Sequence, residues 1–148
     1  AGALRYLDCI GVHYNEGLVP PADSYGDPRG ASSHYTRYYQ GMVDTYYIAA
    51  GGQKPLCFTE LGYLSGEEWG MLPEAFLWAP PYNLSVAEHA QHLADAVQQS
   101  RRQGKVLLLI IFNVDFTFWG DDPQAGYAMV RPGGACPACI TISAAMSE

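Results

Sequence analysis

The longest apolar run of the sequence covers residues 106–112 and constrains the fold more than any other segment. Every side chain in it is apolar, so both alternating faces of a strand would be apolar. This pattern is typical of a parallel strand that is covered on both sides. The run is far shorter than the roughly 18–20 residues that a membrane-spanning helix needs. We therefore predict a buried strand here, and no membrane span.

Two shorter apolar segments earlier in the chain have the same character. Residues 6–14 are mostly apolar, with β-branched side chains near their centre, and they lead into a long loop rich in proline and glycine. Residues 56–59 follow Pro55, and proline is tolerated at the beginning of a strand but not in its middle. Both segments are predicted to be strands, and both are followed by loops long enough to carry function.

Helical patterns separate these three predicted strands. Between Ser33 and Gly51, aromatic and apolar side chains recur at helical spacing, with the serine as N-cap and the glycine as stop. Ser85 and Glu88 form a capping-box pattern, and the helix that they begin is expected to end at Gly104. A further short helix is possible after Pro137.

Strands that alternate with helices indicate an α/β fold with a parallel sheet and right-handed crossovers. The 148 residues suffice for one domain, residues 1–148. Three strands leave two exposed sheet edges, whereas a (β/α)8 barrel needs about 250 residues. The chain enters apolar sequence without a signal-peptide pattern. We therefore expect either an open three-layer module or the C-terminal part of a (β/α)8 TIM-barrel-like fold.

Charge and composition narrow the possible partners. Eight basic residues stand against fifteen acidic ones, for a formal net charge of −7. The basic residues are scattered, whereas a nucleic-acid-binding protein needs a concentrated basic surface. Nucleic acid is therefore not an expected partner. The acidic composition, with eleven tyrosines and three tryptophans, is compatible with a secreted protein.

Candidate functional residues follow the predicted strands, at the edge where parallel sheets collect their chemistry. Glu60 ends a strand and could act as a nucleophile or general acid–base, or could simply cap a helix. His13 and Tyr14 end the first strand and could hydrogen-bond a sugar, although a strand-end histidine is often structural. Trp119, after the third strand, could stack on a pyranose or anchor its loop.

Three motifs in this order resemble the sixth, seventh and eighth strands of clan A retaining glycoside hydrolases, which are (β/α)8 barrels that cut glycosidic bonds. The motifs are Asp8-x-x-Gly-Val-His-Tyr14, Lys54-Pro-Leu-x-Phe-Thr-Glu-Leu-Gly-Tyr63 and Ile111-Phe-Asn-x-Asp-x-x-x-Trp-Gly120. The middle motif is the most specific, because this clan presents its nucleophile in a Thr-Glu-x-Gly segment after an apolar strand. The similarity spans nearly the whole chain and corresponds to less than half of a barrel.

The resemblance implies roles for individual residues. It makes Glu60 the catalytic nucleophile, His13 and Tyr14 groups that orient the substrate or nucleophile, and Trp119 the sugar platform. Asn113, in the third motif, would also contact substrate. The implied partner is an oligosaccharide or polysaccharide, and no cofactor or metal is expected.

The clan's acid/base glutamate follows an asparagine at the end of the fourth strand. Asn15-Glu16 has the same two residue types as this pair. Only one predicted helix separates it from Glu60, whereas three helices separate the fourth and seventh strands of the clan. A retaining enzyme holds its two carboxyl groups roughly 5–5.5 Å apart, and we expect Glu16 to lie on a loop that does not provide this geometry. The chain by itself is therefore expected to be inactive, with the acid/base supplied by an N-terminal half-barrel.

The cysteines and acidic pairs suggest further sites. Cys136 and Cys139 form a single C-x-x-C pair, which favours a local disulfide or two thiols over a metal site. Cys9 and Cys57 are predicted to be buried thiols in neighbouring strands. The acidic pairs at residues 67–68 and 121–122 are expected to be solvated, with a calcium site as the alternative.

Two other functions remain open. The chain could be a non-catalytic carbohydrate-binding module that covers its sheet edges by self-association. Alternatively, it could be a metal or thiol module built on Cys136 and Cys139. The sugar, the linkage and the cellular location are not specified by the sequence.

Overall fold

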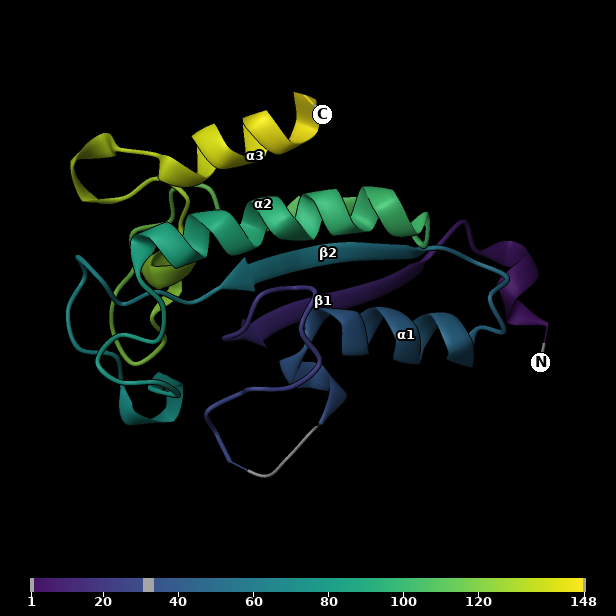
Figure 1. The fold of residues 1–148 in the computed structure, drawn as a ribbon, viewed down its shortest axis with the longest axis horizontal. Helices are drawn as coiled ribbons and strands as arrows, with labels where there is room; N and C mark the ends of the chain where they lie inside the picture. The colour runs from purple at the N-terminus through teal and green to yellow at the C-terminus, as the bar shows by residue number, and fades with distance from the viewer. Residues whose placement is uncertain (1, 31–33, 148) are drawn as a thin grey trace.

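A computed structural model describes residues 2–30 and 34–147, and it is a mixed α/β unit with a three-stranded parallel sheet (Figure 1). The strands lie in the order β1-β2-β3 and are all parallel. The strands are β1 (Ile10–Gly17), β2 (Leu56–Tyr63) and β3 (Val106–Ile111), and the α-helices are α1 (Tyr39–Ala49), α2 (Val86–Gln103) and α3 (Pro137–Ser147).

Helices α1 and α2 pack on the same face of the sheet. Side chains from the strands and from both helices form one core, which includes Val12, Phe58, Leu61, Val43 and Leu93. Two crossovers of the same hand that advance in the same direction across a sheet place both helices on one side. Helix α3 packs along α2 (Figure 1), and its Ala138 and Ile142 belong to the same core.

The opposite face of the sheet is open to solvent. It carries Leu107, Leu108 and Ile110, whose exposed fractions are 63%, 45% and 47%. The expectation that this strand is covered on both sides is therefore wrong for the described residues. Its apolar character is as predicted, but the helices cover only the side that bears Val106, Leu109 and Ile111.

A bulge in β2 determines which way Glu60 points. Leu56 and Phe58 face the helices, and so do Leu61 and Tyr63, although regular alternation would put these two pairs on opposite faces. The register between β1 and β2 shifts by one residue at this point. Val12 pairs with Phe58, but the next residue of β1 pairs with Glu60, so Thr59 is the extra residue of β2. The extra residue leaves both Thr59 and Glu60 off the core face.

The helix ends follow local signals, with one exception. The predicted capping box of Ser85 and Glu88 is present, and Gly104 ends α2 in the left-handed region with φ 63°. Gly51 follows α1 with φ 62°, and the helix expected after Pro137 is α3. Helix α1 begins only at Tyr39, because Tyr38 is extended and residues Tyr35–Arg37 form a separate 3-10 turn. Ser33 lies outside the described residues.

Both cysteine pairs are disulfide-bonded. The prediction of buried thiols at Cys9 and Cys57 is wrong, because parallel pairing of β1 with β2 brings their Cα atoms to 5.8 Å, a distance suited to a disulfide. Cys136 and Cys139 form the local disulfide that was one of the two favoured alternatives. Within residues 2–30 and 34–147, no group of three or more His, Cys, Asp or Glu side chains could hold a metal ion.

The long loops gather at the end of the sheet to which the strands point (Figure 1). They follow β1, β2 and β3, whereas the connections at the other end are short. None of the helices in the described part of the chain is long and apolar enough to cross a membrane.

Candidate functional site

Glu60 lies in the carboxyl half of β2 and is held by the neighbouring strand. The Asn15 side-chain amide Nδ2 donates a hydrogen bond to Glu60 Oε2 at 2.8 Å. The Nδ1 atom of His13 lies 3.4 Å from the same oxygen. The Glu60 side chain is 32% exposed and that of His13 is 58% exposed. The two β1 residues thus fix one carboxylate oxygen, while the group remains accessible to a ligand.

Asn15 is itself fixed from the other side of the site. Its backbone carbonyl accepts a hydrogen bond from the Tyr127 hydroxyl at 3.0 Å, and burial raises the pKa of that phenol well above its ordinary value. The hydroxyl therefore stays protonated and remains a donor. The Asn15 Oδ1 atom is buried and has no hydrogen-bond partner among the described residues.

Gly62 allows these groups to approach each other. A Cβ atom at this position would lie 2.6 Å from the Phe112 carbonyl oxygen, 2.8 Å from a ring carbon of Tyr127 and 2.9 Å from Asn15 Oδ1. These distances are too short for any side chain. The glycine two residues after Glu60 thus brings β1, the end of β3 and the Tyr127 segment together around the site.

Trp119 lies at the same edge, stacked on a second tryptophan. Its ring and that of Trp69 have centroids 6.0 Å apart and an interplanar angle of 16°. Trp119 packs against the apolar cluster of Leu64, Leu72 and Tyr127, which connects the indole pair to the hydroxyl that holds Asn15. Trp69 was not among the predicted site residues, because a tryptophan in a long loop carries no spacing signal.

Tyr14 and Asn113 have contacts that separate them from Glu60. Tyr14 is 1% exposed, faces the helices, and donates a hydrogen bond from its hydroxyl to the Arg37 carbonyl at 3.2 Å. Asn113 donates to the Gln124 carbonyl at 2.9 Å and accepts from the Phe116 backbone N–H. In this arrangement the tyrosine packs in the core and the asparagine shapes its own loop.

A buried arginine joins the loop after β2 to the segment after β3. Arg131 is 2% exposed. It forms an ion pair with Glu68, in which Arg131 Nε lies 3.5 Å from Glu68 Oε2. Its guanidinium donates to the carbonyl oxygens of Ser65, Glu67, Gly126 and Ala128. The Glu67 carboxylate accepts from the Val86 N–H at the start of α2. The prediction that this acidic pair is solvated is therefore wrong for Glu67, whereas Glu68 is exposed as expected, with its side chain 47% exposed.

A second arginine ties the first long loop to the end of β1. Arg29 donates to the Glu16 carbonyl at 2.6 Å and to the carboxylate of Asp27, which is fully buried. Burial opposes ionisation of Asp27, but hydrogen bonds and charge from Arg29 outweigh it and lower the pKa of the carboxyl. Glu16 belongs to β1 and not to a loop as expected, and its side chain is 53% exposed.

The site therefore presents a partly exposed carboxylate, oriented by an amide and an imidazole, at a sheet edge with a stacked indole pair. Such a carboxylate can act as a nucleophile or stabilise a developing positive charge. Comparison of the chain with protein-family models, with curated proteins and with solved structures finds no match.

Proposed function

We propose that this chain is the nucleophile-bearing part of a retaining glycosidase, in which Glu60 attacks the anomeric carbon of a bound sugar. The observation that carries the proposal is the contact of Glu60 Oε2 with Asn15 at 2.8 Å, on the helix-free side of the sheet. In the retaining mechanism one carboxylate forms a covalent glycosyl intermediate, while a second carboxyl group protonates the leaving oxygen.

The topology supports this proposal. In a (β/α)8 barrel the strands follow one another in order, the helices cover the outer face, and bulky branched side chains fill the interior. The order β1-β2-β3, with Leu107, Leu108 and Ile110 on the helix-free face, fits that arrangement. The general acid/base and the remaining strands would then come from a preceding part of a longer protein.

The aromatic side chains favour a saccharide as the ligand. An indole face stacks well on the apolar face of a pyranose, and both rings of the Trp69–Trp119 stack are partly exposed. His13, which is more than half exposed, can donate to or accept from a sugar hydroxyl. Glu60 would supply the covalent bond, and these groups would position the ring.

The test is covalent labelling in the longer protein that carries these residues. We would incubate it with a panel of 2-deoxy-2-fluoro glycosyl fluorides of the gluco, galacto, manno and xylo series, digest it, and identify the modified peptide by mass spectrometry. We expect a glycosyl ester on Glu60 and loss of both label and turnover in Glu60→Gln. A label on another carboxylate, or turnover that survives Glu60→Gln, would overturn the proposal.

The isolated 148-residue chain provides a second comparison. Without a second carboxyl group to protonate the leaving oxygen, we expect no turnover of a natural glycoside by this chain. Turnover of a natural glycoside by the isolated chain, abolished in Glu60→Gln, would show that a residue such as Glu16 protonates the leaving oxygen after all.

The exposed apolar face favours one alternative function, a non-catalytic carbohydrate-binding module that self-associates. Leu107, Leu108 and Ile110 form a contiguous apolar surface on one strand, and such surfaces favour association. Size-exclusion mass and oligosaccharide titration of the longer protein distinguish the two functions. A self-associated form that binds sugar with Glu60→Gln and wild type alike, and without turnover, would favour the binding module.

A further inference from the structure

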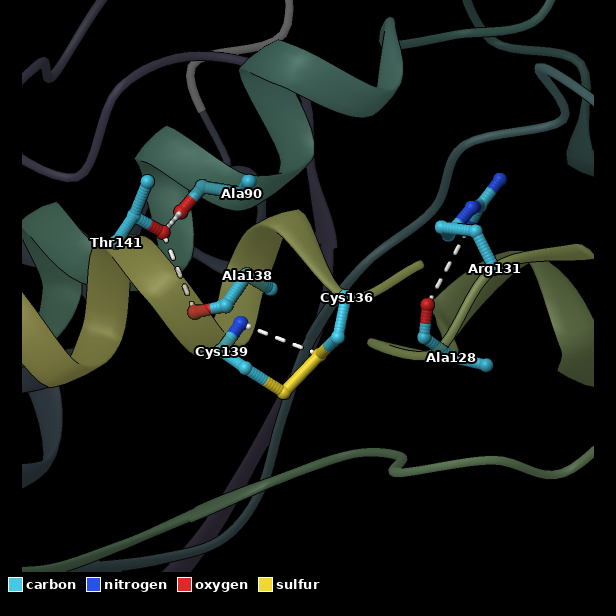
Figure 2. The surroundings of a disulfide bond; sticks show 7 residues. All are labelled: Ala90, Ala128, Arg131, Cys136, Ala138, Cys139 and Thr141. Carbon is cyan, nitrogen blue, oxygen red and sulfur yellow. Dashed lines mark hydrogen bonds between the residues drawn. A yellow bond between two sulfur atoms is a disulfide. The ribbon is translucent and has the colours of Figure 1, made fainter. Parts of the chain in front are cut away.

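The second disulfide lies at the first turn of α3 and joins residues only three positions apart. Cys136 directly precedes Pro137, with which the helix begins, and Cys139 lies in its first turn. The backbone N–H of Cys139 donates to Cys136 Sγ at 3.3 Å (Figure 2). Cys139 is exposed and Cys136 is half-buried, so both sulfur atoms are near solvent.

This geometry favours a negative charge on Cys136. A helix beginning carries unpaired N–H groups and a partial positive charge, which stabilise a thiolate. The N–H of Cys139 already points at the Cys136 sulfur in the oxidised form. If the disulfide opens, Cys136 is therefore the better leaving group, and the exposed Cys139 sulfur is the atom that an incoming thiolate can reach.

Helix α3 is held in place by contacts other than the disulfide. Ala138 is buried against α2, and the Thr141 hydroxyl donates to the Ala90 carbonyl of that helix at 2.8 Å (Figure 2). Before the helix, the Arg131 N–H donates to the Ala135 carbonyl at 2.8 Å. The Cys136–Cys139 bond can therefore open without releasing the elements around it.

The other disulfide contrasts in each of these respects. Cys9 and Cys57 are 48 residues apart in sequence and join neighbouring strands. Cys57 is only 5% exposed, so a thiol in solution has poor access to it. Neither residue lies at a helix beginning. This disulfide has the features of a structural bond, and the Cys136–Cys139 pair has those of an exchangeable one.

We propose that Cys136 and Cys139 form a thiol–disulfide exchange site that reacts with low-molecular-weight thiols and disulfides. A thiolate attacks Cys139 Sγ, the Cys136–Cys139 bond breaks, and its electron pair remains on Cys136 as a thiolate. A second thiolate attacks the small-molecule sulfur of the mixed disulfide and releases Cys139, and the two cysteines take up the two protons. One protein disulfide is reduced and two thiols are oxidised to one disulfide, and the reaction runs in reverse with a disulfide reagent.

The first test measures the redox equilibrium of both disulfides in the same protein. We would equilibrate it in buffers of reduced and oxidised glutathione, quench with acid, alkylate the thiols, and quantify each cysteine peptide by mass spectrometry. The reducing strength of each buffer is the squared concentration of reduced glutathione divided by the concentration of oxidised glutathione. We expect half-reduction of the Cys136–Cys139 bond at a value of this quotient at least a hundredfold lower than half-reduction of the Cys9–Cys57 bond requires. Joint reduction of all four cysteines, or later reduction of Cys136 and Cys139, would overturn the proposal.

The second test measures the thiolate character of the two cysteines and the reaction of each with a small-molecule disulfide. In the reduced protein at pH 6, we expect iodoacetamide to alkylate Cys136 at least tenfold faster than Cys139. In Cys136→Ser, oxidised glutathione should form a stable mixed disulfide on Cys139, since the resolving thiol is absent. The matched Cys139→Ser variant should give the faster-forming adduct on Cys136. Equal alkylation rates, or no adduct in either variant, would contradict the assignment.

Discussion

At the scale of single residues, the orientation of Glu60 depends on Asn15 more than on His13, to which the sequence analysis gave the orienting role. The amide is the closer of its two β1 contacts, at 2.8 Å from Oε2 against 3.4 Å for His13. Asn15 is in turn fixed through its carbonyl by Tyr127. A charge-assisted hydrogen bond of this kind contributes more than a neutral one.

Replacing Asn15 by Ala should slow the proposed chemistry. Loss of a hydrogen bond to a carboxylate costs about 1.5–3 kcal/mol, so we expect the rate of labelling by the fluoroglycoside to fall about tenfold to a hundredfold. Gln91→Ala removes an exposed amide from α2 and serves as the matched control, with a rate close to wild type. A wild-type labelling rate in Asn15→Ala would show that the contact does not position the nucleophile.

Arg131 should matter for stability, because its guanidinium satisfies buried carbonyls of two long loops. Arg131→Met removes all of these donors at once, and each unsatisfied buried acceptor costs about 1–3 kcal/mol. We expect the free energy of unfolding in urea to fall by about 3 kcal/mol or more. Arg102→Met, at an exposed position in the last turn of α2, should change it by less than about 0.5 kcal/mol. A loss below about 1 kcal/mol for Arg131→Met would contradict this role.

At the scale of elements, α2 connects the core to the functional edge through its buried histidines. His89 faces the Tyr127 carbonyl, with Nε2 at 3.3 Å, and His92 packs edge-on against Tyr63. Burial lowers the pKa of His89 to about 4, and the nearby positive charge of Arg131 adds to the effect. Burial also lowers the pKa of His92, against the opposing effect of Asp95, Glu88 and Asp23.

The folded protein should therefore lose stability as the pH falls below about 6.5. In that range the unfolded chain binds a proton at His89 that the folded chain does not, so stability is full above the unfolded pKa and declines towards pH 4. For His89 alone we expect a loss of about 2 kcal/mol between pH 7 and pH 5, measured by urea unfolding. Carboxyl groups ordinarily titrate below this range, so they contribute little to the change in stability between pH 7 and pH 5.

His89→Gln is the control for this effect, since a neutral amide can still donate to the Tyr127 carbonyl. The variant should lose clearly less stability than wild type between pH 7 and pH 5, with His92 responsible for the remainder. An unchanged pH dependence in His89→Gln would assign the effect to other groups.

At the scale of the whole molecule, the Cys9–Cys57 disulfide fastens β1 to β2 at the end of the sheet opposite the site. It spans 48 residues of sequence, so the chain-entropy model gives a stabilisation of about 4 kcal/mol, against about 2 kcal/mol for the short Cys136–Cys139 loop.

The double variant Cys9→Ala, Cys57→Ala should therefore lose about twice as much unfolding free energy as Cys136→Ser, Cys139→Ser. Urea unfolding under non-reducing conditions measures both losses. The comparison fails if removal of the short disulfide destabilises the protein as much as removal of the long one.

Much of the fold is determined by the sequence alone, because it depends on local patterns. The apolar run at residues 106–112 specifies β3, and Ser85, Glu88 and Gly104 specify the ends of α2, since strand periodicity and helix caps act over a few neighbouring residues. The same local signals placed Glu60 in this strand, but the prediction that the strand ends at Glu60 is wrong, because β2 continues to Tyr63. The predicted start of α1 lies several residues before the observed start at Tyr39. The aromatic spacing continues through the 3-10 turn that precedes Tyr39, and such spacing does not distinguish a 3-10 turn from an α-helix.

Only the tertiary structure decided how these elements face one another. The bulge at Thr59 and Glu60, the contact of Asn15 with Glu60, the burial of Tyr14 and the Cys9–Cys57 bond all depend on the register between β1 and β2. That register is set by hydrogen bonds and packing between residues more than forty positions apart, which leave no periodic trace in either segment. The sequence thus determined which elements form and where the acid lies along the chain, and the pairing of the strands decided which side chains surround it.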